Sequence, residues 1–163
     1  MSSGQFVQWQ DLFVLIDDGA ITRYDPIEAA IREQARTLDH GVALLCILPP
    51  EAKPPPDDVK RSVKSALTRL APSLSCLAYV IEGTGFRGVA ARATLVGMKI
   101  FSSRPYPIYV ETSVQEAIGK MAAHLIKAPS AIELTAVLKQ IADARGLRVA
   151  RPTSARPGEL SVK

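Results

Sequence analysis

The apolar and polar positions of the chain follow two alternating patterns, the first of which predicts strands. Residues 6–9 (FVQW) and 12–17 (LFVLID) read as two short strands joined at Gln10-Asp11, which predicts a hairpin. Residues 42–48 (VALLCIL) and 76–81 (CLAYVI) are apolar without alternation, as in strands covered on both faces. Residues 107–111 (PIYVE) predict a last short strand.

The second pattern, apolar residues at helical spacing, predicts two helices before residue 71. The first begins at Asp25, which with Glu28 has the spacing of a capping box. It is predicted to end at His40-Gly41, so we interpret His40 as a helix-end residue and not as a metal ligand or base. The second begins near Asp57-Asp58, after a proline-rich loop, where an N-cap is the simplest role for this acidic pair.

Three more helices are predicted towards the C-terminus. One covers residues 89–100, and another begins after Thr112 or Ser113. The last begins at Ser130, which with Glu133 has capping-box spacing, and ends at residues 145–146. Strands that alternate with helices predict an α/β fold: a small mixed, largely parallel sheet of about five strands, covered by helices, with an extra C-terminal helix.

Composition and charge restrict the class of protein but do not indicate its function. The chain has 163 residues, 47 % of them hydrophobic and 22 % charged, with a net charge of +4. We interpret the basic residues of the tail, 147–163, as a solvated and disordered end, and expect no nucleic-acid partner. Neither a signal peptide nor an apolar run long enough for a membrane span is found, which predicts a cytoplasmic protein.

Residues 82–88, EGTGFRG, carry the one motif that suggests cofactor chemistry. Gly83, Gly85 and Gly88 form G-x-G-x-x-G between a buried strand and a helix, which is the context of a phosphate site. However, a dinucleotide fingerprint follows the first strand of its unit, and this loop follows the fourth. We interpret it as a tight turn, and keep a small anion site as an alternative and a cofactor-binding enzyme as a remote one.

No other pattern in the sequence suggests catalysis or a cofactor. Cys46 and Cys76 lie in apolar runs, where cysteine behaves as a small core residue. His124 follows Met121 on the predicted fourth helix and borders its core face. The chain has no C-x-x-C or H-E-x-x-H motif, so we expect neither an enzyme nor a metal or cofactor site.

The order of these segments resembles that of the STAS domain (sulfate transporter and anti-sigma-factor antagonist). The resemblance rests on the two opening strands, on GAIT at residues 19–22, on the buried strands, and on PIYVETSVQEAIGKM. It divides the chain into a STAS-like domain (1–128), an additional helix packed on it (129–146) and the tail (147–163). It implies a regulatory module that binds protein and is switched by phosphorylation of a serine at the start of the second helix.

The chain departs from this family where the phosphorylated serine is expected. No Ser or Thr precedes Ser62 there, and Asp57 and Asp58 occupy the region instead. The phosphoswitch is therefore not expected. The acidic pair is either an N-cap, as above, or a permanent phosphate-like charge.

Two surfaces are candidates for partner binding. The carboxyl ends of parallel strands share one edge, which groups the second-helix start with the glycine loop. Phe86 in that loop is either an exposed contact or tucked under the helix. The predicted candidate residues for a partner or ligand are Asp57, Asp58, Arg61, Gly83, Thr84, Gly85, Phe86 and Arg87.

The third predicted helix has apolar residues opposite its core stripe. Ala91, Leu95 and Met98 are there, which requires either cover by the last helix or self-association as a homodimer. Together with the lack of catalytic motifs, the resemblance to the STAS domain implies a non-catalytic cytosolic regulatory or scaffolding module with a protein partner. The alternative is a module for a small ligand (a nucleotide, an anion or a lipid) at the same edge.

Overall fold

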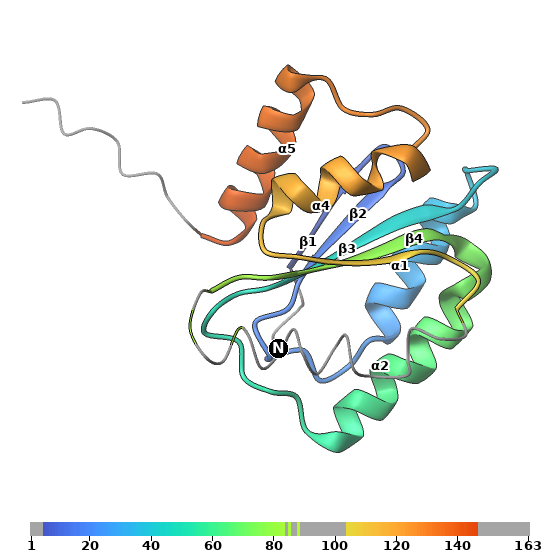
Figure 1. The fold of residues 1–163 in the computed structure, drawn as a ribbon. Helices are drawn as coiled ribbons and strands as arrows, with labels where there is room; N and C mark the ends of the chain where they lie inside the picture. The colour runs from blue at the N-terminus through green and yellow to red at the C-terminus, as the bar shows by residue number, and fades with distance from the viewer. Residues whose placement is uncertain (1–4, 84, 86–87, 89–103, 147–163) are drawn as a thin grey trace, which may run out of the picture.

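The computed structural model describes residues 5–83, 85, 88 and 104–146 (Figure 1). Among them, five strands form one sheet in the order β1-β2-β3-β4-β5. Strand β1 (Gln5–Trp9) is antiparallel to β2 (Leu12–Ile16), and β3 (Val42–Leu48), β4 (Leu74–Ile81) and β5 (Ile108–Glu111) follow in parallel. The fold class predicted from the sequence is confirmed.

The register of the sheet follows from the predicted hairpin. Trp9 pairs with Leu12, so the turn is Gln10-Asp11, with a left-handed φ of 50° at Gln10. Val42–Leu48 pairs with β2 on one side and with β4 on the other, and all but its last residue are buried. The apolar run without alternation therefore marks a central strand covered on both faces, as predicted.

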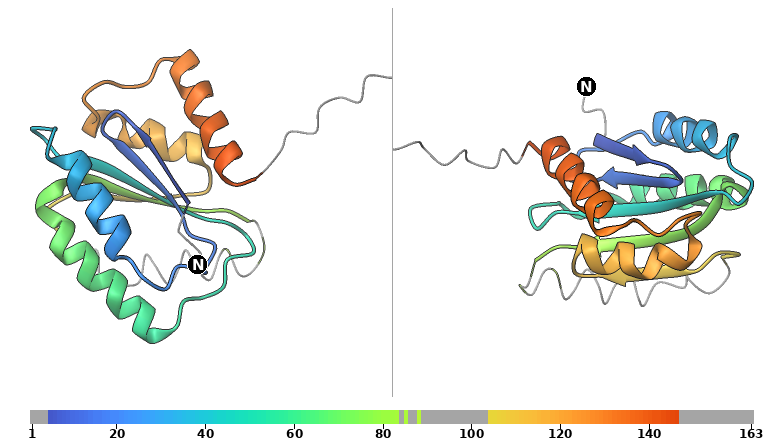
Figure 2. Two further views of the ribbon diagram at one scale, coloured as in Figure 1. Left: turned by 180° about the vertical axis from the view of Figure 1, so that it is seen from behind. Right: turned by 90° about the horizontal axis from the view of Figure 1, so that it is seen from above.

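Helices cover both faces of the sheet (Figures 1 and 2). On one face lie α1 (Asp25–Ala35) and α2 (Asp57–Leu70), which pack against Phe13, Leu44 and Leu77. On the other lie α4 (Val114–Met121) and α5 (Ala131–Ala144), which pack against a second apolar cluster. Short 3-10 turns, η1 (Ala71–Ser73) and η3 (Ala122–His124), follow α2 and α4.

The C-terminal helix α5 contributes buried side chains to the apolar cluster that it shares with α4 and β1. Its Val137 and Ile141 are buried in the cluster that contains Val7 of β1 and Ile118 of α4. Ser130 and Glu133 form the predicted capping box, with both reciprocal hydrogen bonds present. The helix ends at Ala144, and Gly146 after it has a positive φ of 66°.

The start of α1 at Asp25 is as predicted, but the capping role given to Asp25 and the predicted end of the helix are wrong. Asp25 is not an N-cap: the helix begins at Asp25 itself, after Tyr24, which makes no side-chain cap, and Glu28 is used elsewhere. Helix α1 also stops at Ala35, short of His40-Gly41. A turn brings the chain to Gly41, whose φ of 89° and close approach to Ser73 O suit glycine alone.

Candidate functional site

The start of α2, predicted as a partner surface, is exposed on the structure. Asp57, Asp58 and Arg61 are all exposed, and Asp57 Oδ1 accepts a hydrogen bond from Lys60 Nζ at 3.0 Å. Neither aspartate is the N-cap, which was the preferred interpretation: Pro56 occupies that position without a side-chain cap. The acidic pair lies instead in the first helical turn, where the positive end of the helix dipole stabilises the two carboxylates.

The glycine loop is described only at its glycines. Gly83 has a φ of 107° and faces Pro50, and Gly88 N donates to Gly85 O at 3.0 Å, which is a turn. A Cβ added at Gly85 would meet no atom of the described residues within 4 Å. Thr84, Phe86 and Arg87 lie outside the described residues, so the prediction of a site here stays a prediction.

The residue before this loop anchors the last helix to the sheet. Glu82, directly after β4, accepts hydrogen bonds from both terminal guanidinium nitrogens of Arg145, and the bond from Nη1 to Oε1 is 2.9 Å long. The two side chains are only 22 % and 18 % exposed. The carboxylate that begins the EGTGFRG motif therefore already has a partner, which is far away in the sequence.

Among the described residues, the start of α2 and the end of β4, where the glycine loop begins, lie well apart (Figure 1). The loop that joins β3 to α2 approaches Gly83 with Pro50 and Gly19 with Lys53. The predicted self-association residues Ala91, Leu95 and Met98 lie outside the described residues.

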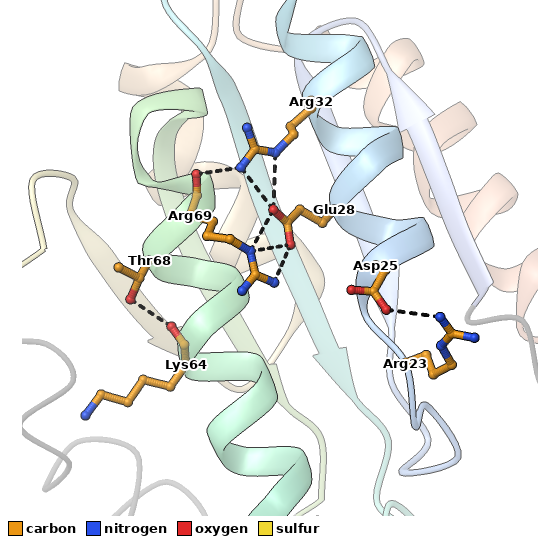
Figure 3. A network of polar contacts seen from close by, with 7 residues as sticks. All are labelled: Arg23, Asp25, Glu28, Arg32, Lys64, Thr68 and Arg69. Carbon is orange, nitrogen blue, oxygen red and sulfur yellow. Dashed lines mark hydrogen bonds and ion pairs between the residues drawn. The ribbon is translucent and has the colours of Figure 1, made fainter.

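A charged cluster that the sequence did not predict lies between α1 and α2 (Figure 3). It consists of Glu28, Arg32 and Arg69, and is called the Glu28 cluster below. Glu28 Oε1 accepts from Arg32 Nε at 3.2 Å and from Arg32 Nη2 at 3.0 Å. Arg69 Nε lies 3.0 Å from both carboxylate oxygens, and its Nη2 is 2.7 Å from Oε2.

Burial distinguishes the carboxylate of this cluster from its two guanidiniums. The side chain of Glu28 is 11 % exposed, whereas those of Arg32 and Arg69 are 46 % and 49 % exposed. Hydrogen bonds from Arg69, and then from Arg32, lower the pKa of Glu28, although desolvation opposes them. One nearly buried anion thus holds two half-exposed cations against the surface.

The cluster lines an open depression between the two helices. Its lining residues are Asp25, Glu28, Ala29, Arg32 and Arg69, and its volume is about 370 Å³. Arg32 Nη2 also donates to Arg69 O at 3.1 Å, which ties α1 to the last turn of α2. Only the Glu28–Arg32 spacing of four residues signalled the cluster in the sequence; nothing there pointed to Arg69.

Further charges lie near Thr68 on α2 and beside Asp25, outside the Glu28 cluster. Arg104 Nη1 donates to Thr68 Oγ1 at 3.0 Å, next to Arg69. Asp25 is paired with Arg23 at 3.5 Å. Lys64 lies one turn before Thr68 on α2, and Thr68 Oγ1 donates to Lys64 O (Figure 3). The lining itself carries two carboxylates and two guanidiniums, and Lys64 and Arg104 are not part of it.

A second polar group that the sequence did not predict lies where β2 and β3 begin. Asp11 is completely buried, and its Oδ2 is 2.9 Å from His40 Nε2 and 2.8 Å from Ile126 N. His40, interpreted above as a helix-end residue, thus joins the loop before β3 to the hairpin turn. We interpret the group as structural, since it holds together the hairpin turn, the loop before β3 and the segment after α4.

The remaining titratable residues of the core do not form a reactive centre among the described residues. Burial raises the pKa of Cys46 above its ordinary value and that of Cys76 to about 11, so both thiols stay protonated. His124 Nε2 is hydrogen bonded to Tyr109 OH at 2.8 Å. No group of three or more His, Cys, Asp or Glu side chains suited to a metal occurs within residues 5–83 and 104–146.

Comparison with known proteins assigns no family. The chain matches no family model, no curated protein and no solved structure. The resemblance to the STAS domain therefore stays a prediction. In the part of the chain that the structure describes, no helix is long and apolar enough to cross a membrane.

Proposed function

We propose that this chain is a non-catalytic cytosolic module, regulatory or scaffolding, that binds a protein partner through the exposed surface of α2. The observation that carries the proposal is the composition of this surface. Its exposed charged residues are Asp57, Asp58, Lys60, Arg61, Lys64 and Arg69. The surface extends from the predicted site at the helix start to the Glu28 cluster.

The shape of this surface favours a protein over a small molecule. Pockets for small ligands are concave, enclosed and mostly apolar, with a few polar groups. The depression between α1 and α2 is open and lined by charged side chains. Arginine, which this surface presents at Arg61 and Arg69, is enriched at protein interfaces and often carries much of the binding energy.

Site-specific photo-crosslinking in cells of the source organism tests this proposal. A benzophenone amino acid at Ser62, exposed on α2, is expected to capture a defined partner. The same amino acid at Ala136, exposed on α5, is the control and is expected to capture nothing comparable. Arg61→Glu should abolish the product, and Lys139→Glu, an equal change of charge on α5, should retain it.

The crosslinking result has two outcomes that would contradict the proposal. One is the absence of any specific product at Ser62. The other is an equal product from Ser62 and Ala136, because it would show contact without a preferred surface.

The alternative function, small-ligand binding, rests on the glycine loop. It is favoured by the G-x-G-x-x-G pattern of Gly83, Gly85 and Gly88. A thermal-shift screen with nucleotides, simple anions and lipids tests it. A ligand at about 100 times its Kd stabilises the folded state by about 2.7 kcal/mol. A shift that Gly85→Asp removes would support this alternative.

A further inference from the structure

We propose that the depression between α1 and α2 binds an acidic segment of a protein partner, whose carboxylates are recognised by Arg32 and Arg69. This inference rests on the proposed function and names the chemistry of the partner. Three features of the depression support it: its two guanidiniums are held in place, the Glu28 cluster has a net positive charge, and its form suits a short protein segment.

The two guanidiniums are held in place before any partner arrives. Glu28 accepts hydrogen bonds from both, and Arg32 is bonded to Arg69 O as well. Each guanidinium has five N–H donors in a planar fork, and the Nη1 group of each has no partner among the described residues. Ordered, half-exposed donors lose little conformational entropy on binding a carboxylate.

The charge around the depression favours an anionic segment. Arg32 and Arg69 share a single carboxylate, so the Glu28 cluster has a net positive charge. Asp25, which also lines the depression, is paired with Arg23. Lys64 and Arg104 add two positive charges near Thr68 on α2, outside the lining of the depression. The tail of this chain, residues 147–163, is itself basic and is therefore a poor occupant.

The form of the depression favours a protein segment over a membrane or nucleic acid. Ala29 lies on α1 between Glu28 and Arg32, and its short side chain leaves room for an extended chain. The basic surface is also short, since α2 begins with exposed Asp57 and Asp58. A continuous polyanion would meet these carboxylates, whereas a short acidic segment would end before them.

Fluorescence anisotropy with a defined probe tests the inference on the full chain. The probe is a fluorescein-labelled peptide of alternating Glu and Gly, and a Lys/Gly peptide of equal length is its control. We expect salt-dependent binding of the acidic peptide only. Arg69→Gln and Arg32→Gln should each weaken it by about tenfold or more, a loss typical of a residue important for binding. Arg36→Gln, at the C-cap of α1 and paired with Glu33, should change it less than about twofold.

A second measurement keeps the test valid if an arginine variant fails to fold. In the unaltered protein, NMR signals of the Arg32 and Arg69 Nε–H groups should shift on addition of the acidic peptide, while that of Arg36 stays in place. No binding, equal loss in all three variants, or shifts confined to other residues would overturn the inference. Tighter binding to phosphatidylserine vesicles than to the peptide would also overturn it, and assign the surface to membranes.

The crosslinking experiment separates failure of this inference from failure of the proposed function. If Ser62 captures a partner equally well with and without Arg69→Gln, the acidic-segment inference is wrong and the protein-binding function stands. If Ser62 captures nothing while the peptide still binds at Arg32 and Arg69, the proposed function fails and the depression is an acidic-peptide site without a cellular partner.

Discussion

Arg145, directly after α5, forms a bidentate ion pair with Glu82, directly after β4 and 63 residues earlier in the chain. The pair joins the C-terminal helix to the carboxyl edge of the sheet. It also fixes the residue from which the glycine loop departs.

Loss of the Arg145–Glu82 pair should loosen α5. Arg145→Met leaves the carboxylate of Glu82 without its partner in a site that is only partly solvated. Breaking a fully buried pair costs about 3–5 kcal/mol, so we expect about 2 kcal/mol here in urea unfolding. Lys139→Met, which breaks the exposed pair with Asp143, should cost less than about 1 kcal/mol. Equal losses in both variants would show that Arg145 acts as a surface charge.

The contribution of Glu28 to stability should depend on pH. The pKa of Glu28 is lowered in the folded protein by Arg69 and Arg32, so the ionised form is favoured by folding. Its contribution is complete above the unfolded pKa of about 4.3 and is lost as the pH falls through the folded value. Glu28→Gln should lower the urea midpoint at pH 7, and the difference should shrink towards pH 3. A difference independent of pH would contradict the role given to the carboxylate.

Two glycines should respond to alanine in opposite directions. A Cβ at Gly41 would lie 2.9 Å from Ser73 O, and the φ of 89° is strained for alanine. We expect Gly41→Ala to cost more than about 1 kcal/mol. Gly119 lies exposed in α4, with no described atom within 4 Å of an added Cβ, so Gly119→Ala should stabilise by about 0.5–1 kcal/mol. Thermal unfolding of the pair measures both, and destabilisation by Gly119→Ala would count against α4 as described.

Asp11 should matter more to folding than His40, although the two are bonded. Asp11→Ala leaves the Ile126 N–H without its acceptor, and we expect a cost of about 2–3 kcal/mol. His40 is 36 % exposed, so His40→Ala should cost about 1 kcal/mol, because water reaches the freed groups. Urea unfolding of both single variants and of the double variant measures the coupling. A larger loss for His40→Ala would reverse this assignment.

The sequence by itself determined the elements of this fold and much of their order. The hairpin at Gln10-Asp11, the central strand VALLCIL and the Ser130–Glu133 capping box all follow from interactions over a few residues. Such interactions depend on spacing along the chain, which a sequence shows directly.

Only the tertiary structure decided which polar groups meet. Glu28 had the spacing of a capping box with Asp25, yet its carboxylate binds Arg69, 41 residues away. Asp11 binds the backbone of Ile126, 115 residues away, and keeps His40 beside the hairpin. The physical reason is that local spacing sets which face a side chain occupies, whereas its partner depends on how the crossovers place distant segments side by side. The Glu28 cluster exists because α1 and α2 cover the same face of the sheet.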